Sequence, residues 1–368
     1  MLLERKSPNN LKPEDRWIFD NWKSYDFPPL KVLVINDGYY NNDGHVWTSN
    51  GEEMVKDSVI APNWQQVPGP LTIAQRRSSV KTGMPGIIWN CNWDHNYYHF
   101  WCDSIPRLLQ MLGHKDLEVI VSTYDITPQR EWVLDILGFN NRKKITSNVI
   151  YHSPKIFLPT FNSFSNSHQN PVLIKKLREI FLPNQGSVDL GKKIYIKRDD
   201  RLTKQSMDVL DKVCKDYGFV QVRLEQYSYQ DQISIFNKAV YIIGIHGAGL
   251  TNVQWCSPGS HLIEIRNKKD NTTPYYYNLS STVDINYWYL LGDKEWGEGD
   301  GNGGVNTARS VMSIKEEELV RVMEEVKNYG AIPTVEPTMI ENAPSLITNK
   351  PGPKERPQKF TRNPIRLD

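Results

Sequence analysis

The sequence predicts an α/β protein of two domains, each built around a parallel sheet. Its 368 residues suffice for two hydrophobic cores. Short apolar runs alternate with amphipathic stretches along both halves, and in the second half they form a βαβαβ series. A polar segment at residues 183–191 separates the two halves. We therefore expect domains at residues 1–185 and 186–330, followed by an extended, Pro-rich tail at residues 331–368.

The first half combines a polar beginning with alternating strands and helices. Residues 1–30 are polar with scattered Trp and Pro, so we expect them to lie along the surface. Residues 38–56 carry Asp-Gly and Asn-Gly pairs, which indicate hairpins. The apolar patterns predict strands at residues 31–35, 86–89, 117–121 and within 149–158, and helices at residues 128–137 and 171–181.

The second half is expected to gather a ligand at the carboxyl ends of its strands, as βαβαβ sheets do. Its apolar runs predict strands at residues 193–197, 219–224, 240–245 and 261–265. Helices are predicted at residues 206–217, from Ser228 to 239, from about 250 to 256, and at 314–326. Six glycines among acids predict a flexible loop at residues 292–304.

The strand at residues 240–245 leads into a turn suited to a phosphate. Gly247 and Gly249 let the backbone approach a ligand, and a helix that begins near Leu250 points free N–H groups at the same place. Such a turn also occurs in α/β domains that bind nothing, and the three-glycine dinucleotide fingerprint is absent. The turn alone therefore leaves both interpretations open.

A second notable region is the helix expected after Asn96, a residue type that caps helices. His99 and Asp103 are four residues apart and share a face, and Arg107 lies near the same stripe. Pro106 should kink this helix, because it lacks a backbone donor. His99 is either a core histidine or a functional base oriented by Asp103, and Asp103 is alternatively an ion-pair partner of Arg107.

Three phrases of the second half occur together in one known family. They are Lys-Ile-Tyr-Ile-Lys-Arg at residues 193–198, Gly-Ile-His-Gly-Ala-Gly-Leu-Thr-Asn at 244–252, and Pro-Gly followed by Ile-Glu-Ile at 258–265. With them the chain resembles glycosyltransferase family 61 over residues 90–290. The segment from Asn96 to Arg107 also resembles a conserved phrase of that family. The family includes plant β-1,2-xylosyltransferases and the N-acetylglucosaminyltransferases that modify EGF repeats and O-mannose.

The resemblance implies a GT-B fold, in which two Rossmann-like domains face each other across a cleft. The C-terminal domain would hold a nucleotide sugar, and the N-terminal domain would present the acceptor. It further implies an inverting transfer from a UDP-sugar, with xylose or N-acetylglucosamine as the leading donors. The acceptor would be a glycan or a protein-linked hydroxyl, and the product a β-glycosidic bond.

The same resemblance assigns roles to individual side chains. His99 is the first candidate for the base and Asp103 the second, with Asn96 and Arg107 in support. Donor binding is expected from two arginines, the turn with its helix, and an acid placed for the ribose hydroxyls: Arg198, Arg201, His246, Gly247, Ala248, Gly249, Leu250, Thr251, Asn252 and Glu264. Glu264 is alternatively an ordinary solvated acid.

We expect neither a metal nor a further cofactor. A metal-dependent transferase would need an Asp-x-Asp element, whereas the chain offers only Asp199-Asp200 and isolated acids. Two other functions stay open: an inactive nucleotide- or glycan-binding module of the same fold, and a dinucleotide-dependent oxidoreductase, whose glycine fingerprint is missing. The donor sugar, the acceptor, the linkage and the oligomeric state are not encoded in a recognisable motif.

Composition and the absence of apolar segments indicate which partners and which location to expect for the protein. A net charge of +2 argues against a nucleic-acid binder, which would carry a basic stripe. The four cysteines have no metal-ligand spacing and are expected to be buried free thiols. The first residues lack the apolar core of a signal peptide, and no apolar run reaches membrane-spanning length. We therefore expect a cytoplasmic or otherwise soluble protein, unlike the Golgi and endoplasmic-reticulum members of the family.

Overall fold

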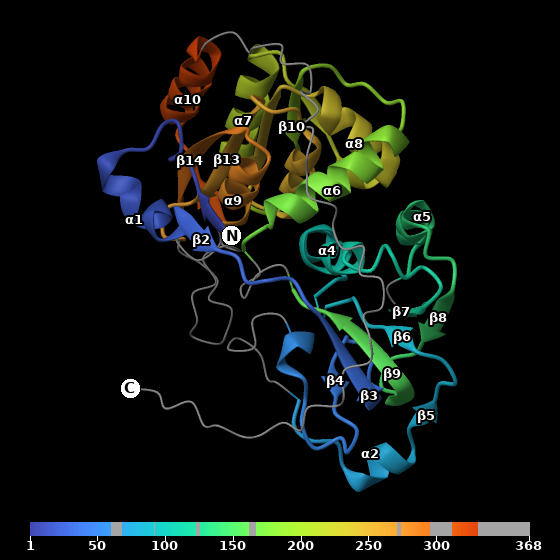
Figure 1. Ribbon diagram of the computed structural model, residues 1–368. Coiled ribbons are helices and arrows are strands. Elements are labelled where there is room, and N and C mark those ends of the chain that lie inside the picture. The colour runs from blue at the N-terminus through green and yellow to red at the C-terminus, as the bar shows by residue number, and fades with distance from the viewer. Residues whose placement is uncertain are drawn as a thin grey trace. The chain divides into compact units, whose positions relative to one another are not determined.

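The computed structural model describes residues 1–59, 68–91, 93–122, 126–161, 167–270, 274–294 and 311–329. Residues Met1–Ile332 form one compact unit, in which helices pack against two sheets (Figure 1). The predicted α/β class is therefore confirmed. The predicted tail at residues 331–368 and residues 295–304 of the predicted glycine-rich loop lie outside the described residues.

The first sheet has seven strands and is mixed rather than parallel. Its order is β4-β3-β9-β6-β7-β8, and β5 also pairs with β9. The strands are β3 (Val32–Tyr40), β4 (Val46–Trp47), β5 (Val80–Lys81), β6 (Gly86–Ile87), β7 (Glu118–Ser122), β8 (Arg142–Ile145) and β9 (Tyr151–Pro159). β9, β6, β7 and β8 run parallel, whereas β3 and β4 are antiparallel additions. The expectation of a parallel sheet is therefore wrong at this edge, where an antiparallel strand is a common addition.

The second sheet has the order β11-β10-β12-β13-β14-β15, and its first five strands are parallel. They are β10 (Lys193–Ile196), β11 (Val220–Val222), β12 (Tyr241–Ile245), β13 (His261–Asn267) and β14 (Asn286–Lys294). The short β15 (Met312–Ser313) pairs antiparallel with the end of β14. The predicted loop therefore begins later than expected, because residues 292–294 belong to β14.

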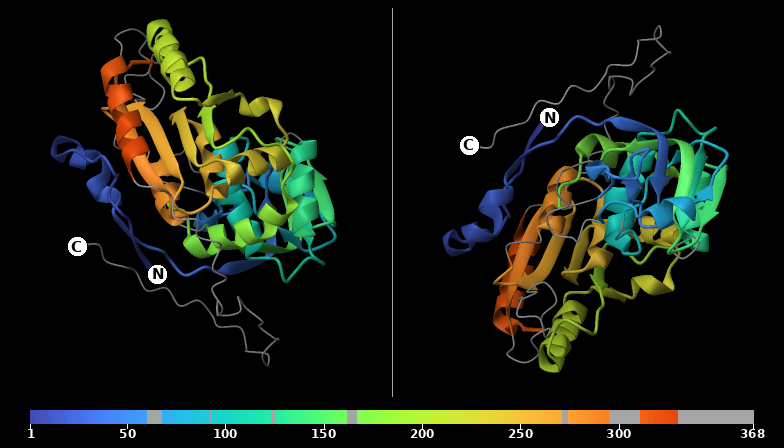
Figure 2. Two further views of the ribbon diagram at one scale, coloured as in Figure 1. Left: turned by 90° about the horizontal axis from the view of Figure 1, so that it is seen from above. Right: turned by 90° about the horizontal axis from the view of Figure 1, so that it is seen from below.

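Helices cover both faces of the second sheet (Figures 1 and 2). α7 (Lys204–Asp216) and α10 (Glu316–Asn328) pack on one face, where Ile243 and Ile263 point. α8 (Tyr229–Lys238), α9 (Tyr275–Thr282) and the 3₁₀ helix η8 (Ala248–Trp255) pack on the other face, with Ile242 and Leu262. Burial on both faces explains why the sequence of β12 is continuously apolar instead of alternating.

The core under α8 and η8 also includes helices of the first half. These are the helical run from Tyr97 to Leu109, α5 (Pro128–Leu137) and α6 (Pro171–Phe181). The rings of Trp101 and Trp255 meet edge to face, with centroids 5.2 Å apart. One hydrophobic core is thus shared by elements that precede and follow the proposed boundary near residue 185, and the division into domains stays a prediction.

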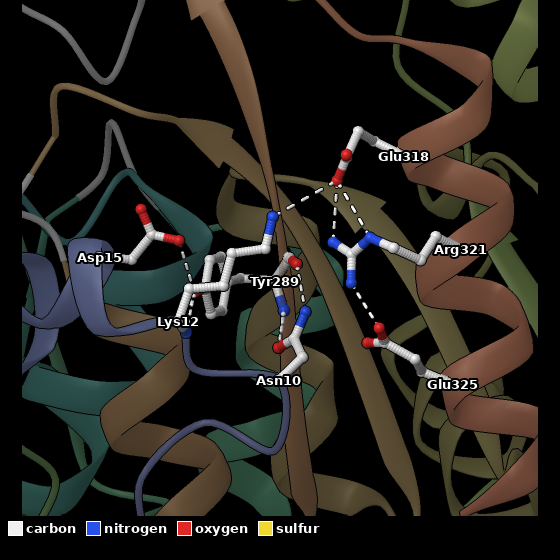
Figure 3. Close-up of polar contacts among 7 residues, drawn as sticks. All are labelled: Asn10, Lys12, Asp15, Tyr289, Glu318, Arg321 and Glu325. Atoms are coloured by element: carbon white, nitrogen blue, oxygen red, sulfur yellow. Dashed lines mark hydrogen bonds and ion pairs between the residues drawn. The ribbon is translucent and has the colours of Figure 1, made fainter.

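The N-terminal segment, residues 1–27, packs against β14 in the second sheet. It contains β1 (Leu2–Glu4), α1 (Arg16–Phe19) and β2 (Ser24–Asp26), and β1 pairs antiparallel with β2. The side-chain amide of Asn10 donates to the carbonyl of Tyr289 at 2.8 Å and accepts from its N–H at 3.2 Å (Figure 3). The segment therefore satisfies backbone groups that β14 would otherwise leave unpaired.

Two further expectations concern the chain as a whole. Cys91, Cys102, Cys214 and Cys256 are all buried free thiols, as predicted. Within the described part of the chain, none of the helices combines the length and the apolar character needed to cross a membrane.

Candidate functional site

The turn after β12 leads into a 3₁₀ helix rather than the expected α-helix. η8 begins at Ala248, two residues earlier than predicted, and ends at Trp255. The side chain of Asn252 donates to the carbonyl of Gly249 at 3.2 Å, and side chains that bond to the local backbone compete with α-helical pairing. The free N–H groups at the start of η8 nevertheless follow β12 directly, as the sequence indicated.

Gly247 allows an arginine to lie against this turn. A Cβ at residue 247 would lie 1.7 Å from Nη1 of Arg198, so a side chain there would displace the guanidinium. Arg198 donates from Nε and Nη2 to the two carboxylate oxygens of Asp200 at 3.0 and 2.9 Å. Arg201 also pairs with Asp200, at 3.4 Å. The hydrogen bonds from Arg198 keep the pKa of Asp200 below its usual value, so this carboxylate stays ionised between the two arginines.

A cavity of about 380 Å³ opens at this place. Its lining comes from the carboxyl ends of β10 and β12, from residues 224–229, and from Tyr97 and Gln129 of the first half. The chain leaves β10 for β11 on one side and returns to β12 on the other side. Parallel sheets bind ligands at such a switch in strand order, and the cavity is within the size range of ligand pockets, about 300–1,000 Å³.

The helix that carries His99 starts as predicted but contains a wide turn. Asn96 accepts a hydrogen bond from the N–H of Tyr98 at 2.9 Å, which confirms it as the cap. The run consists of α3 (Tyr97–His99), the π-helical segment Phe100–Ser104 and α4 (Ile105–Leu109). Pro106 cannot donate to the turn before it, and the widened turn just ahead of it takes the place of the expected kink.

His99 and Asp103 form a hydrogen-bonded pair. Nδ1 of His99 lies 2.6 Å from Oδ2 of Asp103, and the Asp103 side chain is 2 % exposed. Burial raises the pKa of Asp103, although the hydrogen bond with His99 acts in the opposite direction. With Nδ1 bound to the carboxylate, Nε2 of His99 has no hydrogen-bond partner among the described residues and is the free basic atom.

Arg107 is fully buried and serves the fold around this helix. Its Nε donates to the carbonyl of Pro159 at 2.8 Å, and its Nη1 donates to the carbonyl of Asn90 at 2.7 Å. Burial lowers the pKa of Arg107 to about 10. Arg107 thus ties the helix to the ends of two strands, and its hydrogen bonds go to carbonyls rather than to Asp103.

His246 belongs to a second histidine–carboxylate pair. Its Nδ1 lies 2.5 Å from Oε1 of Glu264, and the hydroxyl of Tyr287 donates to Oε2 of Glu264 at 2.6 Å. Glu264 is completely buried in the middle of β13, and not at a strand end as expected, because β13 continues to Asn267. The role of Glu264 as a ribose ligand stays a prediction, and the solvated alternative does not fit its burial.

The two motif regions contact each other. The hydroxyl of Tyr97 donates to Oδ1 of Asn252 at 2.7 Å, which joins the His99 helix to η8. Tyr98 lies beside His99, with ring centroids 5.3 Å apart, and beside Tyr275. The neighbouring Tyr276 lies 5.1 Å from His246. Both histidines therefore flank one group of tyrosines.

The match to known families covers these elements. The family model described as glycosyltransferase 61 matches residues 97–263, from the start of α3 into β13. Residues 97–263 of this chain belong to glycosyltransferase family 61. No curated protein matches the sequence. Family membership indicates a glycosyltransferase with a nucleotide-sugar donor and a glycan acceptor.

The structure places the remaining candidates of this glycosyltransferase in three groups. Arg198, Gly247, Ala248, Gly249, Leu250 and Asn252 line the cavity. Thr251 and Glu264 are fully buried and do not line it. His99, Asp103 and His246 lie outside the lining, near the tyrosines. Within the described residues no three His, Cys, Asp or Glu side chains are grouped to hold a metal, and metal independence stays a prediction.

Sequence reasoning missed the tyrosines that connect these groups. Tyr97 and Tyr98 precede His99 directly, so their place beside the motif was a usable signal. Tyr276 and Tyr287 belong to α9 and β14, which carry no motif. Only the register of β14 with β13 brings Tyr287 to Glu264.

Proposed function

We propose that this glycosyltransferase is an inverting enzyme of the GT-B type, with two Rossmann-like domains. It would transfer a sugar from a UDP-sugar to a hydroxyl of a glycan or glycoprotein and form a β-glycosidic bond. The observation that carries this proposal is the cavity at the β10–β12 switch, which Arg198 and the Gly247–Gly249 turn line.

The donor diphosphate would lie where positive charge and free N–H groups converge. Arg198 lies against Gly247 just before η8 and shares Asp200 with Arg201, and an arginine fork can bind two phosphate oxygens at once. Donors that are fixed before the reaction stabilise the charge of a leaving diphosphate without reorganisation. Apolar and aromatic lining from Leu224, Tyr227 and Tyr229 would keep water from the nucleotide.

His99 would remove the proton of the acceptor hydroxyl. Its Nδ1 is held by Asp103, so Nε2 is the ring nitrogen left to take the proton of the acceptor. A single displacement needs one base and no covalent nucleophile, which agrees with inversion of the anomeric carbon. Asp103 remains the second candidate for the base, and Asn96 and Arg107 would support the helix that carries both.

Xylose and N-acetylglucosamine are the leading donor sugars, because family members use them. Arginine side chains and the start of η8 would neutralise the diphosphate, so we expect transfer to persist in excess EDTA. Sugar transfer measured before and after chelation checks this, and rescue by an added divalent cation would contradict it.

The function can be tested in two steps. A thermal-shift screen with UDP, GDP, CMP and NAD should show stabilisation by UDP, whereas selective stabilisation by NAD would favour an oxidoreductase. UDP release from UDP-xylose and UDP-N-acetylglucosamine should then increase when sugar acceptors are added. Binding of UDP without any turnover across acceptors would favour the inactive binding module.

A further inference from the structure

We infer that Glu225 recognises the ribose of the nucleotide donor by accepting hydrogen bonds from its 2′ and 3′ hydroxyls. The inference rests on the proposed function and deepens it, because it names the side chain that selects a ribonucleotide over a deoxyribonucleotide. Glu225 contacts the donor away from the bond that breaks, so it sets donor affinity and takes no part in the chemistry.

Glu225 is the only acidic side chain among the described residues that line the cavity. A carboxylate close to a bound diphosphate repels the ligand unless it accepts hydrogen bonds from it. The 2′ and 3′ hydroxyls of a ribose are such donors, and the two oxygens of a carboxylate can accept from both. The acid and Arg198 in one cavity thus suit two neighbouring parts of one nucleotide.

The strand order places Glu225 beside the expected diphosphate position. Gly247 follows β12 and Arg198 follows β10, whereas Glu225 lies in the 3₁₀ turn η7 (Leu224–Gln226) after β11. β11 pairs with β10 on the side away from β12, and neighbouring strands lie about 4.8 Å apart. Within the described chain, the cavity lining includes residues that follow β11 and none from β13. A nucleotide with its diphosphate at β10 and β12 therefore extends its ribose toward β11.

The loop that carries Glu225 is held in place by the protein itself. Nε2 of Gln232 in α8 donates to the carbonyl of Leu224 at 3.0 Å and to that of Tyr227 at 3.1 Å. Gln232 is buried, and its Oε1 accepts from the side-chain amide of Asn252 in η8 at 3.0 Å. These bonds connect the loop to the helix that begins at the phosphate-binding turn. The position of the loop relative to that turn is thus set before a nucleotide binds, which lowers the cost of binding.

The Glu225 carboxylate is available to a ligand. Its ion pair with Arg223 is 3.9 Å long, and Arg223 pairs more closely with Asp199, at 2.7 Å. The Glu225 side chain is 69 % exposed and forms no hydrogen bond with the described residues. Glu264, the acid expected for the ribose, is buried outside the lining, and its oxygens contact a histidine and a tyrosine at 2.5 and 2.6 Å. Of the two acids, Glu225 is the one whose oxygens a ribose can reach.

Removing the hydroxyls from the ligand and the carboxylate from the protein tests this contact in one cycle. Calorimetry in EDTA measures the affinities of UDP and 2′,3′-dideoxy-UDP for the wild type, Glu225→Ala and the control Gln226→Ala. The wild type should bind UDP about tenfold or more tightly than the dideoxy analogue, as expected for hydrogen bonds to a charged acceptor. Glu225→Ala should bind both nucleotides with nearly equal affinity. Gln226→Ala should keep the wild-type ratio, because Gln226 follows Glu225 directly but does not line the cavity.

Sugar transfer separates this binding role from a role in the chemistry. Glu225→Ala should raise KM for the UDP-sugar and leave kcat within about twofold, because the ribose contact is the same in the ground state and the transition state. Glu225→Gln keeps an acceptor oxygen without the charge, so its preference for UDP should lie between those of the wild type and Glu225→Ala.

The outcomes that contradict the inference are distinct from those that contradict the proposed function. Equal binding of UDP and the dideoxy analogue by the wild type would overturn the inference, and so would an unchanged preference for UDP in Glu225→Ala. A loss of GDP binding in Glu225→Ala with that preference unchanged would assign the carboxylate to a guanine base and overturn it as well. A wild type that neither binds UDP nor transfers sugar would instead refute the proposed function.

Discussion

Each histidine of the candidate site is bound through Nδ1 to a buried carboxylate, yet the two pairs have different origins. His99 and Asp103 belong to one helical run. His246 follows the end of β12, whereas Glu264 lies in the middle of the adjacent strand β13. A carboxylate at Nδ1 leaves Nε2 as the ring nitrogen available to a ligand in each pair. In the proposed reaction the pair of His99 and Asp103 accepts the proton of the acceptor hydroxyl.

Replacing His99 with Ala should separate chemistry from donor binding. Nε2 of His99 lies outside the cavity lining, so UDP affinity should stay near the wild-type value. Loss of a general base should lower kcat by about 10²–10⁴-fold. UDP calorimetry and initial rates measure the two quantities, and near-normal turnover would exclude His99 as the base.

Replacing Asp103 with Asn should stabilise the protein while it lowers activity. Burial raises the pKa of Asp103 in the folded state, so its favourable contribution exists at low pH and is lost as pH rises through that raised value. Asp103→Asn should therefore become more stable than the wild type as pH rises above 3.8, the ordinary pKa of the group. The difference in stability should be constant at neutral pH. Turnover should fall roughly a hundredfold or more, because the amide no longer selects the tautomer.

Melting temperatures of wild type and Asp103→Asn, recorded across pH, check this sign. Equal melting temperatures at acidic pH and a higher one for the variant at neutral pH are expected. A variant that is less stable at neutral pH would show that the ion pair with His99 outweighs the burial of the charge.

Sequence spacing could predict the first pair but not the second. Residues four apart on a helix face each other whatever the rest of the fold does, and the π-helical segment leaves His99 and Asp103 within reach. Glu264 and Tyr287 are 23 residues apart, and they meet only because β14 pairs with β13 in one register. No local sequence pattern predicts that register. The contact with Tyr287 was therefore not foreseen, and Glu264 was expected to face a ligand instead.

Among the elements, the junction of β12 and η8 depends most on a single glycine. Gly247→Ala would place a methyl group on Nη1 of Arg198, and the guanidinium would have to leave the turn. UDP affinity should fall by about tenfold or more, as expected for a lost charge-assisted contact. Gly83→Ala is the matched control, because nothing lies within 4 Å of its Cβ position. Equal UDP affinity in both variants would show that Arg198 does not contribute to donor binding.

Elements with clear end signals were predicted well, and irregular ones were not. The helices at residues 128–137 and 171–181 agree with the structure, since Pro at the first position and a capping Thr127 or Asn170 define their starts. The 3₁₀ form of η8 and the π-helical segment before Pro106 escaped prediction, because both arise from packing and side-chain bonds. β14 was missed, although every second residue from Tyr287 onward points into the shared core.

At the scale of the whole molecule, the N-terminal segment was the largest surprise. Composition predicted a polar stretch along the surface, yet Phe19 is completely buried against Tyr277, Tyr287 and Tyr289. These three tyrosines lie more than 250 positions away along the chain, and sequence patterns cannot connect residues so far apart. Through Tyr287 this segment also supports the Glu264–His246 pair.

The attachment of this segment rests on Asn10, and Asn10→Ala should therefore destabilise the fold. The variant leaves both the N–H and the carbonyl of Tyr289 without their partners, at an expected cost of about 1–3 kcal/mol. Asn9→Ala is the control, because Asn9 contacts the carbonyl of Tyr287 through its backbone N–H and not its side chain. The nearby ion pair of Lys12 with Glu318 is about two-fifths exposed on each side and contributes little (Figure 3). In chemical denaturation, the midpoint of Asn10→Ala should thus be clearly lower than the midpoints of Asn9→Ala and Lys12→Ala. Equal midpoints would mean that the segment docks through its apolar side chains alone.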